Sequence, residues 1–212
     1  MEVYETEEQQ VEALRKWFKK RGKLILTSAS LIVLLISGAQ YTRHHMKVTR
    51  EAASNVYQAM IVAIEKQDKV TAQAKANHLS HEYESSIYGS IAKLYLAKVA
   101  VEDQKWDDAQ SQLEWVMQHA KSPEFQEVAR LRLAKLLFTQ KKSEEALKLL
   151  DETHKKNDYY LSLLQELKAD ILSSQNKRAQ AHALYKLAQE AILKKELYNP
   201  LLKMKLEELG EG

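Results

Sequence analysis

A set of alanines recurs along this chain at intervals of 35 to 37 residues. The four positions are Ala72, Ala109, Ala146 and Ala181. The residues four positions further on are Ala76, Leu113, Leu150 and Tyr185, so one helix face carries the same small and apolar pattern in each copy. A period of this length, in which no single unit can bury its own apolar face, predicts a stack of helical hairpins.

A second helix precedes each of these alanines and repeats with the same period. Twelve residues before each alanine stand Met60, Ala97, Ala134 and Ala169, and nine before stand Ala63, Ala100, Leu137 and Leu172. Small residues at both places let two antiparallel helices approach closely. The pattern resembles the tetratricopeptide repeat, and QKWDDA (104–109) matches its turn, with Trp106 in the usual aromatic position. Ser143 and Arg178 replace that aromatic residue in later copies.

Composition supports an all-α fold. Together with the resemblance of the repeats and an uncharged N-terminal segment, it predicts a single N-terminal transmembrane helix followed by a tetratricopeptide-like helical-hairpin solenoid. The 212 residues include only five glycines and two prolines, which favours helix over strand and turn. Asn199-Pro200 breaks the last long helix, so LLKMKLEEL (201–209) is predicted to be a short capping helix. The absence of cysteine excludes a disulfide framework and a thiol nucleophile.

The transmembrane helix is predicted from residues 24–42, which carry no charge. These 19 residues would reach roughly 28 Å as a helix, close to the hydrocarbon thickness of a bilayer. Six cations lie at 15–23 and three at 43–50, so the positive-inside rule predicts a cytoplasmic tail (1–23) and an external domain (43–212). The alternative is a signal peptide cleaved after Ser37-Gly38-Ala39, although the preceding segment is long and begins acidic.

The sequence offers little chemistry for catalysis. His78 and His81 with Glu82 have the spacing of metal ligands on a helix, but no third and fourth ligands stand nearby, and we expect ordinary polar residues there. No phosphate-binding, nucleotide-binding or nucleophile motif occurs. Residues 51–212 contain 23 Lys and Arg against 24 Asp and Glu, which argues against nucleic acid as a partner. We therefore expect no enzyme, no cofactor and no metal.

The inner face of the solenoid is the stronger candidate for function. In a tetratricopeptide stack, the first helix of each hairpin lines a groove at fixed offsets from its small alanine. The predicted partner-binding residues are Leu94, Lys98, Val101, Leu131, Lys135, Phe138, Glu166 and Asp170. This groove would be apolar, with two lysines and an acidic end. The alternative interpretation is that both lysines are simply solvated and the apolar residues belong to the core.

The N-terminal sequence adds a family resemblance. MEVYETEEQQVEA (1–13), followed by one span and degenerate helical repeats, resembles the YfgM-type ancillary subunits of the SecYEG translocon. Weaker similarity continues at YGSIAKLYLAK (88–98), LRLAKLL (131–137) and SEEALKLLDE (143–152), and it fades over the last 25 or so residues.

The resemblance implies a non-catalytic adaptor with a single uncleaved span in the bacterial inner membrane, and thus contact with membrane lipid. It also implies a periplasmic domain, and two protein partners: the SecYEG translocon and a membrane-anchored periplasmic chaperone of the prolyl-isomerase type. Two other functions stay open on the sequence. One is a regulator that signals through its cytoplasmic tail, and the other is a metal-dependent periplasmic enzyme that uses His78, His81 and Glu82.

Overall fold

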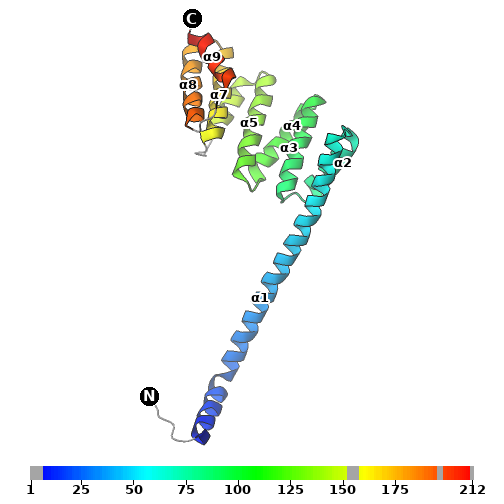
Figure 1. Cartoon of the computed structure of the whole chain (residues 1–212), viewed down its shortest axis with the longest axis vertical. Coiled ribbons are helices and arrows are strands. Elements are labelled where there is room, and N and C mark those ends of the chain that lie inside the picture. The colour runs from blue at the N-terminus through cyan, green and yellow to red at the C-terminus, as the bar shows by residue number, and fades with distance from the viewer. Residues whose placement is uncertain (1–6, 152–157, 195–197, 211–212) are drawn as a thin grey trace. The chain divides into compact units, whose positions relative to one another are not determined.

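The computed structural model describes residues 7–151, 158–194 and 198–210, and every described element is an α-helix (Figure 1). The chain divides into two compact units, Met1–Ala52 and Ala53–Gly212. Helix α1 (Glu7–Glu65) forms the described part of the first unit and also supplies the first helix of the second.

The predicted membrane span lies in the first unit, within α1, and the side chains at 24–26, 29, 30 and 39 are outside the described part of the structure. Over the described part of the chain, no helix combines the length and the apolar character needed to cross a membrane. Residues 31–36 form a run of large aliphatic side chains that are each more than half exposed, from 52% at Ile36 to 69% at Leu34.

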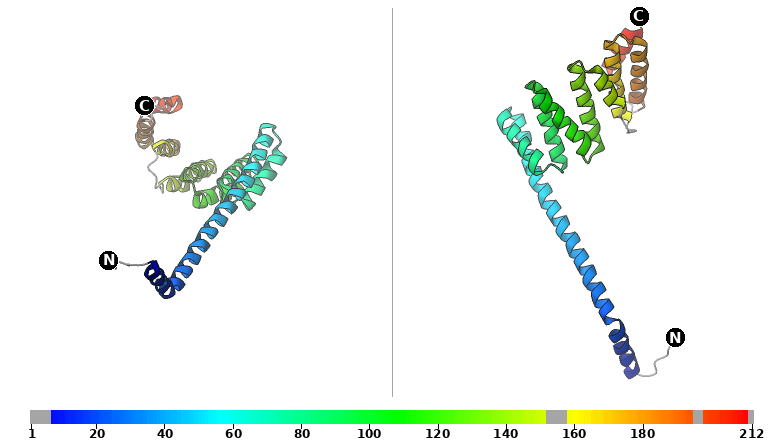
Figure 2. Two further views of the ribbon diagram at one scale, coloured as in Figure 1. Left: turned by 60° about the horizontal axis from the view of Figure 1, so that its bottom comes forward. Right: turned by 180° about the vertical axis from the view of Figure 1, so that it is seen from behind.

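The second unit is a series of antiparallel helices that pack on one another in chain order (Figures 1 and 2). After α1 they are α2 (Lys69–Glu82), α3 (Ile87–Glu102), α4 (Trp106–His119), α5 (Pro123–Thr139), α6 (Ser143–Asp151), α7 (Asp158–Ser174), α8 (Arg178–Leu193) and α9 (Pro200–Gly210). Helix α3 also contacts α5, and α5 contacts α7, so the first helices of successive hairpins lie side by side.

The turns inside the hairpins repeat with the predicted period. Each contains one non-glycine residue with positive φ, in the left-handed region: Gln67, Gln104, Lys141 and Asn176. Each also contains a backbone hydrogen bond spanning five residues, for example from the Lys105 N–H to the Ala100 carbonyl at 2.8 Å. This is the Schellman arrangement, which satisfies carbonyls at the end of a helix. Four equivalent turns therefore confirm that the hairpins are copies of one unit.

The repeating alanines lie where the sequence predicts close contacts between helices. Ala72, Ala109, Ala146 and Ala181 have no exposed surface, and neither have Ala134 and Ala169, while Ala97 is 2% exposed. The largest cluster of buried residues runs from α3 to α7, and a second cluster joins α7, α8 and α9. A third joins the end of α1 to α2 and α3 through Met60, Leu79 and Ala92. The predicted register of the hairpins is confirmed.

Candidate partner-binding surface

The predicted groove residues lie on three successive first helices. Leu94, Lys98 and Val101 are on α3, Leu131, Lys135 and Phe138 are on α5, and Glu166 and Asp170 are on α7. Leu94 is only 6% exposed and belongs to the main core cluster, so it contributes to packing and offers little surface. Leu131 and Phe138 are half-buried against the same cluster.

The two lysines of this surface are exposed. Lys98 forms an ion pair with Glu102 at 3.6 Å one turn further along α3, and its side chain remains 67% exposed. Lys135 is also exposed and lies one repeat later, at the equivalent place on α5. The surface of α3 and α5 thus presents two cations beside the half-buried Leu131 and Phe138 and the exposed Val101, which is suited to contact with another polypeptide.

A cavity of ≈ 230 Å³ adjoins Lys98 at the first hairpin, between the end of α1, the start of α2 and the second half of α3. Ala72, Tyr95 and Val99 line it together with charged residues. Glu102 lies there within 3.7 Å of Lys69 as well as 3.6 Å of Lys98. Burial, followed by the negative charge of Glu102, raises the pKa of Tyr95, so its hydroxyl stays protonated and can donate a hydrogen bond.

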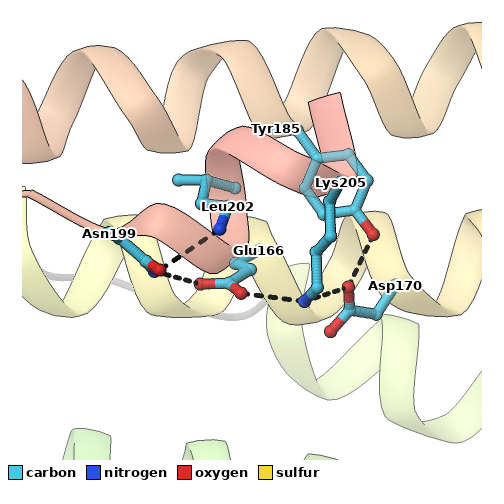
Figure 3. A network of polar contacts seen from close by, with 6 residues as sticks. All are labelled: Glu166, Asp170, Tyr185, Asn199, Leu202 and Lys205. Atoms are coloured by element: carbon cyan, nitrogen blue, oxygen red, sulfur yellow. Dashed lines mark hydrogen bonds and ion pairs between the residues drawn. The ribbon is translucent and has the colours of Figure 1, made fainter. Parts of the chain in front are cut away.

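The acidic end of the groove is occupied by the C-terminal helix (Figure 3). The Lys205 Nζ lies 2.8 Å from Glu166 Oε1 and 2.7 Å from Asp170 Oδ1. Tyr185 donates its hydroxyl to the same Asp170 oxygen at 2.5 Å. Asn199 donates to Glu166 at 3.3 Å and also accepts the Leu202 N–H at 3.2 Å, which caps the start of α9. The two carboxylates are therefore held in contacts within the chain.

The pKa shifts in this network follow from its burial and pairing. Burial alone would lower the pKa of Lys205, but its hydrogen bonds to Asp170 and Glu166 outweigh that effect, and the net shift is upward. The pKa of Tyr185 is raised strongly, first by burial and then by its hydrogen bond to Asp170. Both groups are thus protonated throughout the neutral range.

Sequence reasoning missed Lys205, Tyr185 and Asn199 as parts of this site. The spacing of Glu166 and Asp170, four residues apart on one helix face, indicates that they act together. A capping helix was also predicted at 201–209. Nothing in the sequence shows which α9 side chain meets the carboxylates, because their contact spans 35 to 39 residues.

The candidate metal ligands lie on the surface of α2. His78, His81 and Glu82 are all exposed, and the His78 ring lies edge-on to Tyr83 with centroids 5.7 Å apart. Among the residues that the structure describes, no group of three or more metal-binding side chains is close enough to hold an ion.

Comparison with known families agrees with the repeat geometry. The family model of the tetratricopeptide repeat-like domain matches residues 15–211. The chain belongs to this family. In the structure, α3, α5 and α7 are the first helices of successive hairpins, and α4, α6 and α8 are the second.

This tetratricopeptide-like chain is also 33% identical, over 100 residues, to the ancillary SecYEG translocon subunit of Escherichia coli (strain K12). The match covers 46% of this chain and 47% of the relative, so it spans about half of each protein. The resemblance noted in the sequence is confirmed to that extent. No solved structure matches the chain.

Proposed function

We propose that this protein is a non-catalytic adaptor at the inner membrane, ancillary to the Sec translocon, which it links to a membrane-anchored periplasmic chaperone. The observation that carries the proposal is the surface of α3 and α5, where Lys98 and Lys135 stand at equivalent positions beside half-buried apolar residues. A surface of this kind can bind a peptide segment through apolar contacts while the charges set its register. Similarity to an ancillary translocon subunit supports the translocon as one partner.

The membrane anchor at 24–42 is part of the same proposal. Its support is the absence of charge from this segment, together with the exposure of the aliphatic run at 31–36. A helix that is apolar all round needs lipid or protein around it. We propose that the N-terminus is cytoplasmic and the repeats are periplasmic, because most of the nearby cations precede the segment.

Charge reversal on the proposed surface tests the adaptor function. Lys98→Glu with Lys135→Glu should reduce recovery of the translocon and the chaperone when the tagged full chain is purified from detergent-solubilised membranes. The loss should be greatest at low salt, because exposed charges are then least screened. Lys148→Glu with Lys186→Glu is the matched control, since both are exposed lysines on second helices, α6 and α8. Equal recovery with both double variants would reject this surface as the docking site.

Topology is tested separately. A reporter that is active only in the cytoplasm, fused after Gly212, should be silent, and the N-terminal sequence of the mature protein should begin in the tail. A mature protein that starts at Gln40 would instead identify residues 1–39 as a signal peptide.

A further inference from the structure

Helix α9 depends on docking for its structure. Within Pro200–Gly210, Leu202 alone is buried, at 1% exposure, while Leu201 and Met204 are 55% and 63% exposed. An isolated helix of 11 residues is marginal in water, so α9 is stabilised chiefly by what it contacts on α7 and α8.

Leu202 and Lys205 make the most buried apolar contact and the ionic contact of α9, and the partly buried Leu206 and Leu209 pack against the same cluster. Leu202 packs into the cluster that includes Tyr185 and Ile192 of α8. Lys205, three residues later and so on the same helix face, sits between Glu166 and Asp170 of α7. Figure 3 shows Leu202 and Lys205 on α9, with Lys205 reaching the two carboxylates of α7.

The α7 surface that receives Lys205 belongs to the same series of repeat positions as the lysines of the proposed partner surface. Asp170 follows its repeat alanine, Ala169, as Lys98 follows Ala97 and Lys135 follows Ala134. Without Lys205, two partly buried carboxylates would lie beside each other and lack their cation, which is unfavourable until another cation arrives. Charge complementarity thus selects a basic ligand at this end of the surface.

We propose that the surface of α7 and α8 beneath α9 binds a helical segment of a partner protein in which a lysine follows a leucine by three residues. This surface consists of Glu166, Asp170, Tyr185 and Ile192, and we call it the Leu-Lys site after the two side chains that it receives. Helix α9 is its intramolecular occupant, and the partner segment displaces it. The inference deepens the proposed adaptor function and rests on it. Because α9 is tethered, its effective concentration is on the order of millimolar, and the free chain keeps the site closed.

A peptide probe tests the site without any natural partner, so its outcome is independent of translocon or chaperone binding. The probe is a fluorescent synthetic peptide with the sequence of residues 198–210, and the receptor is the full chain in detergent. Lys205→Glu should place a glutamate of α9 against the two carboxylates. The repulsion should undock α9 and open the site. We expect this variant to bind the peptide at least tenfold more tightly than the wild-type chain, as measured by fluorescence anisotropy.

Matched variants make the result specific. Lys203→Glu has the same charge change on an exposed part of α9, where Lys203 pairs only with Glu207 at 3.6 Å among the described contacts, and it should bind as weakly as the wild type. Adding Glu166→Gln and Asp170→Asn to Lys205→Glu should abolish the gain, as should a peptide with glutamate in place of the lysine equivalent to Lys205. Equal binding by the Lys203 and Lys205 variants, both with wild-type circular dichroism, would overturn the proposal.

Two further measurements on the unmodified chain guard against a variant that fails to fold. Amide hydrogen exchange in α9 should be at least tenfold faster than in α7 and α8, as displacement requires, and equally slow exchange would overturn the proposal. Light scattering should give a monomer at all concentrations. A concentration-dependent dimer that exchanges α9 between copies would assign the site to a second copy of this chain and would also overturn it.

Discussion

The α7–α8 hairpin and α9 are neighbours that are held in different ways. The hairpin has a positive-φ turn at Asn176, and its small alanines, Ala169 and Ala181, are completely buried. Helix α9 has one buried leucine, two partly buried leucines (Leu206 and Leu209) and a set of polar contacts centred on Lys205. The hairpin is thus specified by close packing distributed along two helices, whereas α9 is specified by a few individual side chains.

The difference has an energetic consequence. Adding volume anywhere along a close contact between small residues forces the two helices apart, and this loss of packing destabilises the whole stack. A short terminal helix docked by a few side chains can leave while the rest stays folded, so the cost of damaging it is limited to its docking free energy.

Overpacking a hairpin should have the largest effect. Ala134→Leu on α5 introduces three extra carbon atoms at a fully buried position and should reduce the free energy of unfolding by about 1–3 kcal/mol in denaturant titration. Ala183→Leu on α8 is the control, because Ala183 is exposed and the substitution is identical. Similar midpoints for both variants would contradict the proposed packing of the hairpins.

Truncating the α9 anchor should cost less overall. Leu202→Ala removes a buried side chain whose loss in a closed core would cost about 2–5 kcal/mol. Here α9 can undock, so the cost cannot exceed the free energy with which α9 docks. We therefore expect a decrease of roughly 1 kcal/mol in the free energy of unfolding. Hydrogen exchange should accelerate in α9 and stay unchanged in α7 and α8. A loss as large as that of Ala134→Leu would show that α9 is an integral part of the stack.

Alkaline pH should weaken α9 docking selectively. The pKa of Lys205 is higher in the docked state than its ordinary value of 10.5, so the docked state holds its proton more tightly. The stabilisation is complete below that ordinary value and is lost as the pH rises through the raised one. The difference in melting temperature between wild type and Lys205→Met should be constant from pH 7 to about 10 and then shrink. A difference that changes near neutral pH would exclude Lys205 as the titrating group.

Charge reversal on the proposed partner surface should have the smallest effect on folding. Lys98 and Lys135 are exposed, so their replacement by glutamate should alter the free energy of unfolding by under about 0.5 kcal/mol. Partner recovery should nevertheless fall, as described above. A large drop in melting temperature would mean that these lysines support the fold. A loss of partner recovery would then not identify this surface as the docking site.

The sequence alone determined the hairpin register. Small residues at fixed offsets and a 3.6-residue helical period decide which side chains face a neighbouring helix, and both are visible in the chain. The burial of Ala97, Ala134 and Ala169 follows directly from that pattern. The capping helix at the C-terminus was also predictable, because Pro200 must begin a new element.

Only the tertiary structure decided which groove residues are available. Leu94 was predicted as a groove residue and is packed in the core at 6% exposure, in one cluster with residues of α4, α5, α6 and α7. Glu166 and Asp170 were predicted as the acidic end of the groove, and the structure pairs them with Lys205. Helical periodicity is a local property that a sequence displays, whereas contacts between residues 35 to 39 apart depend on how separate helices dock. That docking is set by the shape of the buried surface, which no spacing along the chain records.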